Sequence, residues 1–476
     1  MKSISVQVAG PSYQDRSSML SDQYTQNCYL GQGRAGESQW CSYDFPGCKA
    51  FLSASGADRG MVEYLGETYK VSGSTLYSIN SSGTATSRGS VPGSGRCIFA
   101  IAYDESITGY GLVIVTDGIP YYYDQSAVAV MSDADLIQPI NSVTMLNDVL
   151  VFDRPDGEIV ASEGGTPTTI SAYYASTNTK PDGIQRLYTF GQLIYVFGSQ
   201  SIEPWYYNGS TAGFIFSRQE QGVITVGLGA RHSLSSDENY MYFFGHDRRV
   251  YRLRGALAEP ISMGQSDELE SLTTYDDAIG WCLKIDGQGF YWLTFPTAGK
   301  SLLYSTTHNY WTHLAYGTDS ENPARHLANS HLYINGKNYV ADYNNGNVYE
   351  LDKATYTDNG AARLRIRVMS PLTGEQLGLL GRRITVGRLQ LQAQVGVGLA
   401  TGQGVNPVLM IQASGDGGKT WGSILHVPIG ELGDYVQIVK FDQFVNGRSI
   451  VYRIMCSDPV YMSIFGGMAD VADGGY

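Results

Sequence analysis

The chain has 476 residues, with 57 Gly, 35 Tyr, only 16% charged residues and a formal net charge of −13. This acidic balance argues against a protein that grips nucleic acid through many phosphate contacts. No apolar run approaches the roughly 20 residues that span a bilayer, and the N-terminal stretch lacks the apolar core of a signal peptide. We therefore expect no membrane insertion by this chain.

Residues 1–55 are irregular and rich in Gly, Ser and Gln. We expect this segment to form an extended N-terminal arm. We also expect it to contribute a strand that closes a ring formed by the following residues.

Between residues 56 and 355 the chain repeats one pattern, in which two alternating apolar stretches flank a turn. This alternation predicts strand pairs, and Asp-Gly or Asn-Gly dipeptides tolerate the positive φ of tight hairpins. The hairpins recur roughly every 45 residues, a period typical of β-propeller blades. They span residues 63–79, 112–124, 148–162, 193–207, 240–255, 290–305 and 337–352.

A single blade cannot bury its apolar faces alone, so neighbouring blades must stack and the ring must close. We therefore predict an all-β chain with a β-propeller over residues 56–355. Six or seven blades are compatible with the pattern, and the seven hairpins favour seven. Several unrelated β domains are the alternative.

After residue 355 the hairpin repeat ends, and longer predicted strands follow. Residues 356–476 predict a C-terminal antiparallel β-sandwich that carries one Asp-box hairpin. The box is the stretch SGDGGKTW, and its pattern S-x-D-x-G-x-T-W matches Ser414, Asp416, Gly418, Thr420 and Trp421.

Asp-boxes occur in sialidases and other carbohydrate-cleaving propellers, but each role in the box is structural. We expect Asp416 to accept hydrogen bonds from turn amides, Gly418 to take a conformation closed to other residues, and Trp421 to tuck beneath the hairpin. Ser414 and Thr420 are the expected local hydrogen-bond partners. Glycoside hydrolysis needs two carboxylates at a defined separation, and no motif singles out such a pair. We predict no catalytic residue and no cofactor.

Potential metal ligands are scattered along the chain. The six cysteines, at positions 28, 41, 48, 97, 282 and 456, form no C-x-x-C pair, so we expect free thiols in a reducing cytoplasm. The pairs His308/His313 and His326/His331 are each five residues apart. Residues five apart on a strand point to opposite faces, so we predict no metal site.

Arginines gather at residues 247–255 and 380–388, and aromatic residues at 121–124, 204–207 and 290–295. Salt-bridged surface strands explain the arginines, with a subunit interface as the alternative. Packing between strands explains the aromatic clusters, with sugar stacking as the alternative.

Residues 178–209 resemble a segment of the tail-hub proteins of short-tailed bacteriophages, also called packaged-DNA stabilisation proteins. Residues 27–51 and 447–460 resemble the early and the C-terminal regions of such proteins. The matching residues in the central segment are Pro181, Asp182, Gly183, Phe197, Gly198, Ser201, Ile202 and Glu203.

The resemblance implies a structural virion protein without enzymatic activity. Several copies, with six expected, would form a ring that extends the portal-adaptor channel and retains packaged DNA. The resemblance also implies contacts with the portal adaptor protein, a plug or needle, and fibres or spikes, while DNA passes without sequence-specific binding. The expected location is the phage tail of the virion, assembled in the host cytoplasm. The alternative is a propeller glycosidase or depolymerase, or a carbohydrate-binding module.

Overall fold

The structure is a computed structural model that describes residues 1–14, 22–32, 40–177, 182–210, 213–220, 222–379 and 381–475. Within these ranges the helices are η1 (Met263–Gln265), α1 (Ser266–Glu270) and η2 (Gly374–Leu377), and the other regular elements are strands. The prediction of an all-β chain is confirmed. None of the described helices has the length and apolar character needed to cross a membrane.

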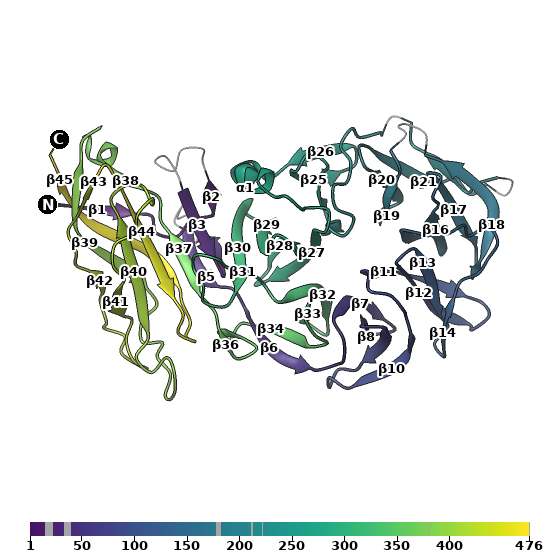
Figure 1. The fold of residues 1–476 in the computed structure, drawn as a ribbon, viewed down its shortest axis with the longest axis horizontal. Helices are drawn as coiled ribbons and strands as arrows, with labels where there is room; N and C mark the ends of the chain where they lie inside the picture. Colours follow the sequence, from purple (N-terminus) through teal and green to yellow (C-terminus); the bar gives the residue numbers. More distant parts are fainter. Residues whose placement is uncertain are drawn as a thin grey trace.

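Five four-stranded antiparallel sheets, and then four antiparallel strands of a larger sheet (residues 279–316), follow one another along the chain and stand around a common centre as six blades of a β-propeller (Figure 1). Within each sheet the strands pair in chain order, because tight hairpins join neighbours. At one such turn Asp117 and Gly118 have φ values of 49° and 78°, the positive range that the Asp-Gly dipeptide favours. The propeller prediction is confirmed.

The first three blades comprise β7 (Asp58–Tyr64), β8 (Glu67–Ser72), β9 (Thr75–Ile79) and β10 (Ala85–Ser90); β11 (Ile98–Asp104), β12 (Gly109–Thr116), β13 (Ile119–Tyr123) and β14 (Val128–Val130); and β15 (Val143–Leu146), β16 (Val149–Asp153), β17 (Glu158–Glu163) and β18 (Thr166–Ser176). The next three comprise β19 (Ile184–Phe190), β20 (Leu193–Gly198), β21 (Ile202–Tyr207) and β22 (Phe216–Arg218); β23 (Ser235–Ser236), β24 (Met241–Phe244), β25 (Val250–Arg254) and β26 (Leu257–Pro260); and β27 (Ile279–Ile285), β28 (Gln288–Phe295), β29 (Lys300–Ser305) and β30 (Tyr310–Tyr316).

A composite sheet lies between the last and the first of these six blades. Its strands β32 (Ala328–Ile334), β33 (Lys337–Asp342) and β34 (Val348–Asp352) are consecutive, but its next strand is β6 (Gly47–Leu52) from the N-terminal segment. Gly47 lies opposite Asp352 in antiparallel register. Strand β32 contacts β27 on one side and β7 on the other. Two strands separated by about 300 residues of chain therefore join the ends of the ring.

Apolar clusters hold neighbouring sheets together, and each cluster draws side chains from two adjacent sheets. Val113 of β12 and Phe152 of β16, for example, are both fully buried in one cluster. At the composite sheet Tyr339 packs with Met61 of the first sheet. Burying one such side chain contributes about 1.5–3 kcal/mol, so each sheet depends on its neighbours for stability.

Outside the ring, two sheets share an apolar core. Phe441 of one sheet makes an edge-to-face contact with Tyr452 of the other, with ring centroids 5.6 Å apart. One sheet contains β1 (Lys2–Val6), β4 (Cys28–Gln32), β5 (Trp40–Asp44), β39 (Ile384–Ala393), β42 (Val439–Phe441), β43 (Val445–Gly447) and β45 (Ile464–Asp473). The other contains β3 (Asp22–Gln26), β37 (Arg365–Val368), β40 (Val408–Ser414), β41 (Leu425–Pro428) and β44 (Ser449–Cys456), and is continuous with β30 through β3.

Short strands complete these sheets at their margins. They are β2 (Tyr13–Gln14) on β3, β31 (Ala324–Arg325) on β30, β35 (Thr357–Asp358) on β6, β36 (Ala361–Ala362) on β35 and β38 (Leu372–Thr373) on β44.

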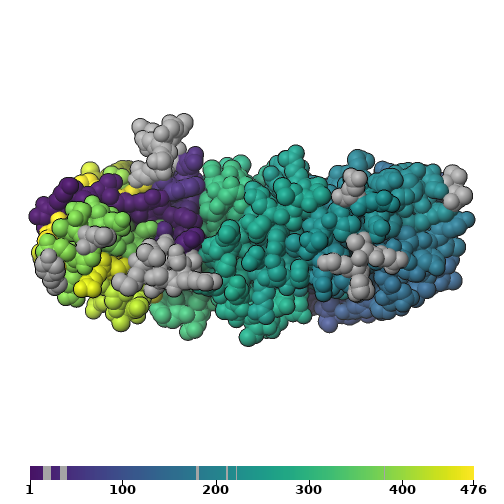
Figure 2. Space-filling model, turned by 90° about the horizontal axis from the view of Figure 1, so that it is seen from above, coloured from purple at the N-terminus to yellow at the C-terminus, as the bar shows by residue number. Residues whose placement is uncertain are grey.

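The N-terminal segment is shared between the ring and the C-terminal sheets. Besides the ring strand β6, it supplies β1, β3, β4 and β5 to the two C-terminal sheets, and β1 pairs with β45 near the end of the chain. In Figure 1 the two chain ends lie at the same end of the molecule. Figure 2 shows an elongated molecule in which the purple N-terminal residues lie beside green and yellow C-terminal residues.

Ring closure by β6 depends on a glycine. A Cβ at Gly47 would collide with the backbone carbonyl oxygens of Thr355 and Thr357. We expect Gly47→Ala to lower the free energy of unfolding by about 2–3 kcal/mol through overpacking, measured by urea denaturation. Gly164→Ala is the control, because its Cβ would meet no atom within 4 Å, and it should change stability by less than about 0.5 kcal/mol. Equal losses in both variants would contradict this role of β6.

Candidate functional site

Three fully buried arginines lie where the N-terminal segment, the ring and the C-terminal sheets meet. Arg363, Arg365 and Arg367 are 1%, 0% and 2% exposed. They alternate with Leu364 and Ile366, which are buried in a separate apolar cluster. Because successive side chains of a strand point to opposite faces, this alternation directs all three guanidinium groups to one side.

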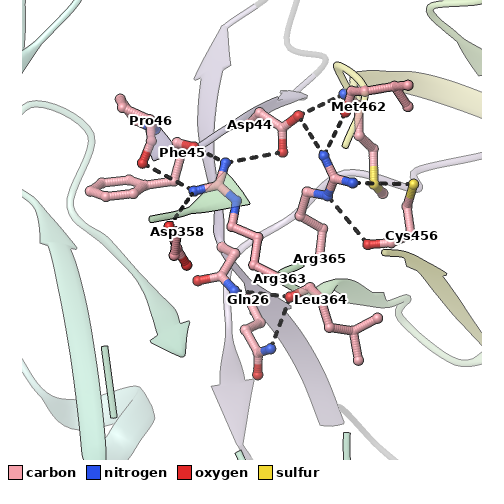
Figure 3. A network of polar contacts seen from close by, with 12 residues as sticks. Gln26, Asp44, Phe45, Pro46, Asp358, Arg363, Leu364, Arg365, Cys456 and Met462 are labelled. Atoms are coloured by element: carbon pink, nitrogen blue, oxygen red, sulfur yellow. Dashed lines mark hydrogen bonds and ion pairs between the residues drawn. The ribbon is translucent and has the colours of Figure 1, made fainter. Parts of the chain in front are cut away.

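Arg365 connects β37 to the N-terminal strand β5 and to the C-terminal segment (Figure 3). Its Nη1 lies 3.1 Å from Oδ2 of Asp44 and donates to the carbonyl oxygen of Val460 at 2.6 Å. The same Asp44 oxygen accepts the amide of Met462 at 2.7 Å. Burial alone would lower the pKa of Arg365, but the nearby Asp44 carboxylate outweighs burial and raises it. The guanidinium therefore stays charged.

The two flanking arginines fix two further segments. Arg363 donates to the carbonyl oxygens of Phe45 and Pro46, just before β6, and its Nη1 lies 3.7 Å from Oδ1 of Asp358. Arg367 donates to the carbonyl oxygens of Val8 at 2.6 Å and Gly10 at 2.8 Å. Arg363 lies two residues before β37, and Arg365 and Arg367 lie on it. The three arginines thus hold parts of the chain that are more than 300 residues away in sequence.

The Asp-box of residues 414–421 forms a compact hairpin after β40. Oδ1 of Asp416 accepts the amides of Lys419 at 3.0 Å and Thr420 at 2.9 Å, while Oδ2 accepts the Thr420 hydroxyl at 2.6 Å. Ser414 Oγ donates to Asp416 and accepts the amide of Gly418, whose φ is +90°. These hydrogen bonds, that of Ser414 first, lower the pKa of Asp416. The carboxylate is thus occupied by its own turn.

Trp421 lies half-buried at a crevice of about 540 Å³ between the ring and the C-terminal sheets. The Arg453 guanidinium lies 4.7 Å from the Trp421 ring centroid. Within the described residues, the carboxylates that line the crevice are those of Glu268 and Glu321. Glu321 pairs with Arg453 at 3.1 Å.

Glu268 ends a chain of contacts that resembles a hydrolase triad. Ser12 Oγ lies 3.0 Å from His313 Nδ1, and His313 Nε2 lies 2.9 Å from Glu268 Oε2. In a hydrolase such an order would activate the serine. Here Ser12 is only 3% exposed, and its Oγ already exchanges hydrogen bonds with the backbone of Thr25. The contacts therefore serve the junction between β2, α1 and β30.

Cys48, His326 and Asp358 form a buried group with potential metal-ligand atoms within 4.8 Å of one another. The amide of Ala328 donates to His326 Nδ1 at 3.1 Å, so a neutral ring carries its proton on Nε2, the nitrogen that faces Cys48 Sγ at 3.8 Å. Burial lowers the pKa of His326 to about 4 and raises that of Cys48 well above its usual value. A protonated thiol beside an N–H does not suit a metal ion, and the group fits a neutral, hydrogen-bonded core. All six cysteines are described, and no two of them form a disulfide in the structure.

Several residues that carry the family resemblance fix a turn in the sheet β19–β22. An Asp before the first strand accepts hydrogen bonds from the turn between the second and third strands, and we call this arrangement the hairpin lock. Asp182 precedes β19, and its carboxylate accepts the amide of Gln200 at 2.7 Å and the hydroxyl of Ser201 at 3.1 Å. A Cβ at Gly198 would come within 2.6 Å of Asp182 Oδ2. Gly183 is exposed, and Pro181 lies outside the described residues.

The remaining residues of this segment are packed into the sheet. Phe197 and Ile202 are fully buried, and Glu203 is 3% exposed. Glu203 lies 3.8 Å from Arg218 and accepts the indole N–H of Trp205 at 3.3 Å. The lock and the Asp-box lie at opposite ends of the molecule in Figure 1, so they form no common site.

The same lock recurs in the sheet β27–β30. Asp277 stands two residues before β27, as Asp182 stands two residues before β19. Its Oδ2 accepts the amide of Thr297 at 2.7 Å, and Thr297 follows β28 by two residues, as Gln200 follows β20. Each Asp ties the segment that leads into a first strand to the turn between the second and third strands.

Two arginines of the stretches 247–255 and 380–388 form surface ion pairs, and most aromatic side chains of the predicted clusters pack between strands, as the sequence predicts. Arg252 pairs with Glu259 at 2.8 Å and Arg388 with Asp442 at 2.6 Å on the surface. The aromatic side chains of residues 121–123 and 290–295 are buried, whereas Tyr206 and Tyr207 are 43% and 42% exposed. Sequence reasoning missed the arginines of β37, although the R-x-R-x-R alternation at 363–367 is a visible signal for one shared face.

Replacing Arg365 should destabilise the fold, because Arg365 is the nearer counter-charge of the buried Asp44 carboxylate. We expect Arg365→Met to lower the free energy of unfolding by about 3–5 kcal/mol, because the buried Asp44 carboxylate loses its nearer guanidinium and keeps only Arg363 at 3.8 Å. We expect Arg365→Met with Asp44→Leu to recover part of this loss. Urea denaturation measures both. The control is Arg448→Gln on the exposed surface, with an expected change below about 0.5 kcal/mol. A loss under 1 kcal/mol for the single variant would contradict the role of Arg365.

The Glu268 contacts predict a pH dependence. Burial would raise the pKa of Glu268, but the charge and hydrogen bond of His313, together with Lys300, lower it from 4.5 to about 2. The resulting stability, about 3 kcal/mol, is fully present above pH 4.5 and is lost as the pH falls through the range down to 2. We expect the difference in unfolding free energy between the natural protein and Glu268→Gln to shrink accordingly between pH 6 and pH 2. A difference independent of pH would refute this.

Comparison with characterised protein sequences finds no match. Among solved structures, a streptogramin B lyase has a TM-score of 0.40 at 11% identity, covering 68% of this chain and 98% of that chain. An inactive virginiamycin B lyase from Staphylococcus aureus with quinupristin has 0.42 at 12% identity, covering 62% and 94%. BamB from Moraxella catarrhalis has 0.34 at 11% identity, covering 61% and 93%. These low values carry no functional conclusion.

A family model described as bacteriophage P22 Gp10, β-propeller, matches residues 4–356. The match covers the N-terminal strands, the ring and the composite sheet, and includes both the Asp182 lock and the residues 44–46 that Arg363 and Arg365 hold. The chain therefore belongs to the phage DNA-stabilisation tail protein family.

Proposed function

We propose that this chain is the tail hub, or nozzle, of a short-tailed phage, a structural virion protein without enzymatic activity. In this proposal several copies, six expected, assemble into a ring that extends the portal-adaptor channel and retains packaged DNA. The ring also receives the plug or needle and the fibres or spikes. It is assembled in the host cytoplasm and stays in the tail of the virion. Family membership over residues 4–356 is the observation that carries this proposal.

The hydrogen bonds that connect the ring to the N-terminal and C-terminal strands support a mechanical role. A hub must transmit load between neighbours without bending. Arg363, Arg365 and Arg367 join the ring, the N-terminal strands and the C-terminal sheets through hydrogen bonds to backbone carbonyls. A closed ring also leaves few free strand edges to aggregate.

We further propose that the composite sheet acts as a seventh blade and that the C-terminal sheets form a β-sandwich. Support comes from the pairing of β6 with β34 and from the apolar clusters on both sides of the composite sheet. The core shared by the two C-terminal sheets supports the sandwich. The division into residues 1–55, 56–355 and 356–476 accompanies this proposal, with strands of the first segment serving both other parts.

The rival function is a propeller glycosidase or depolymerase, or a carbohydrate-binding module. A glycosidase needs a carboxylic acid whose pKa is raised enough to protonate the leaving group. In the crevice beside the Asp-box, the pKa of Glu268 is instead lowered to about 2, and Asp416 is engaged by its own hairpin. These observations favour the structural role.

The decisive experiment removes the protein from the phage that carries it. We expect particles assembled without this chain to lose their DNA after packaging, measured as nuclease-protected DNA per head and as empty heads by electron microscopy. The purified chain added in trans should restore protected DNA and infectivity. Heads that stay full and tailed without it would refute the proposal.

A parallel assay tests the rival directly. Purified protein is incubated with host surface polysaccharide, and the release of reducing ends is measured. We expect no release above that of a heat-denatured sample. Turnover that Glu268→Gln or Glu321→Gln abolishes would favour the glycosidase.

A further inference from the structure

Basic side chains gather at the centre of the ring although the chain as a whole is acidic. They come from the first strands of different sheets or from the residues that lead into them: Arg96 before β11, Arg186 on β19, Arg231 and His232 before β23, and Arg325 before β32. Strands β11, β19, β27 and β32 surround the ring centre in Figure 1. With a formal net charge of −13, composition alone does not explain this gathering.

A cavity of about 290 Å³ is lined by three of these basic residues, Arg96, Arg231 and His232. Arg96 lines it from one sheet, Asn141 from the next, and Arg231 and His232 from the sheet of β23–β26. The sheets of β11–β14 and β23–β26 are not neighbours in the ring, so residues from both can line one cavity only near the axis. The cavity is therefore axial.

Arg96 occupies a position that holds a hairpin-locking Asp in two other sheets, but Arg96 itself locks no hairpin. It stands two residues before β11, where Asp182 and Asp277 stand in their own sheets and lock a hairpin. In the sheet of Arg96 the lock is reversed, because Asp117 in the turn accepts the amides of Ser94 and Gly95, each at 2.9 Å.

The arginines at the axis repel one another. The pKa of Arg186 falls to about 10, first because burial disfavours its charge and further because Arg96 and Arg231 are near, although Tyr188 acts in the opposite direction. Burial, followed by the charges of these three arginines, lowers the pKa of His232 well below its usual value.

The nearby carboxylates only partly compensate this positive charge. Asp58 lies near Arg96, Asp153 near Arg231 and Asp277 near Arg325. Asp117 also lines the cavity, but its carboxylate lies 3.5 Å from Arg59 in addition to the two amides. Each carboxylate thus has its own partner or faces one arginine, and the positive charges remain in excess at the axis.

Hydrogen bonds orient the guanidinium groups of Arg186 and Arg231 at this site, but some N–H donors have no acceptor. Arg186 Nη1 donates to the carbonyl oxygen of Arg231 at 2.9 Å, and Arg231 Nη1 donates to Asn141 Oδ1 at 3.1 Å. Among the described residues, Arg96 Nη1, Arg186 Nε and Arg231 Nε make no hydrogen bond. The side chains of Arg96 and Arg231 line the cavity and are only half-buried. Unpaired buried donors are costly, and an anion in the cavity would bring acceptors and negative charge beside both side chains.

We propose that this axial cavity binds a phosphate group, with Arg96 and Arg231 as hydrogen-bond donors and Arg186 as a nearby positive charge. The planar guanidinium group matches phosphate oxygens with paired N–H donors. A doubly charged oxyanion would offset the repulsion among the arginines. The volume suits a free phosphate or a single phosphoryl group, and this site is independent of the proposed tail function.

Thermal unfolding with inorganic phosphate, titrated against sodium chloride at equal ionic strength, tests the proposal. We expect phosphate to raise the melting temperature of the natural protein saturably, and Arg96→Gln to lose this rise. Without phosphate, Arg96→Gln should melt at the same or a higher temperature than the natural protein, because one repelling charge is gone. The control Arg448→Gln, on the exposed surface, should keep the full phosphate response. Arg231→Gln serves as a second variant should Arg96→Gln fail to fold.

Two further probes identify the source of the phosphate. Adenosine monophosphate and a short single-stranded oligonucleotide without terminal phosphates are titrated in the same assay. A saturable rise with phosphate or the monophosphate alone assigns the site to free or terminal phosphate, whereas displacement of phosphate by the oligonucleotide assigns it to phosphodiesters. Equal rises with chloride, or a phosphate response that survives in both arginine variants, would overturn the proposal.

Discussion

The structure depends on the burial of three guanidinium groups, that of Arg363 just before strand β37 and those of Arg365 and Arg367 on it. Arginine has five N–H donors and keeps its charge, so it is stable in a protein interior only where acceptors surround it. The three arginines meet this condition by binding carbonyl oxygens from the segments around Val8, Phe45 and Val460, together with the Asp44 carboxylate. Each segment is held where it satisfies an arginine, and the ring and the C-terminal sheets are positioned together.

The ring itself relies on a second, repeated constraint. A blade is a twisted sheet whose first strand must begin at a fixed place relative to its own hairpins. Asp182 and Asp277 achieve this with one hydrogen-bond geometry at identical spacing from their strands. Asp117 achieves the same from the turn side. Because Asp117 carries the lock in its sheet, the equivalent leading position there can hold Arg96.

Short-range sequence patterns predicted several features of the structure correctly, whereas contacts between distant residues were not predictable from the sequence. The seven hairpins, the Asp-box partners of Asp416 and the family resemblance around Asp182 all rest on short-range patterns: alternation, turn-forming pairs and residues a few positions apart. The structure places an alternating hairpin in each of those segments. Histidine spacing was a poorer guide, because His326 meets Cys48 and Asp358 rather than His331, and such meetings depend on strands far apart in the chain.

The sequence by itself determined the all-β character, the tight hairpins and the family, because strand alternation and turn chemistry act over a few residues. Only the tertiary structure decided that β6 pairs with β34, that β1 pairs with β45, and that the arginines at 363, 365 and 367 face inward to distant carbonyls. It likewise decided that arginines from four sheets meet at the axis. These outcomes depend on closing the chain on itself, and no local pattern encodes which remote backbone groups will be left in need of a partner.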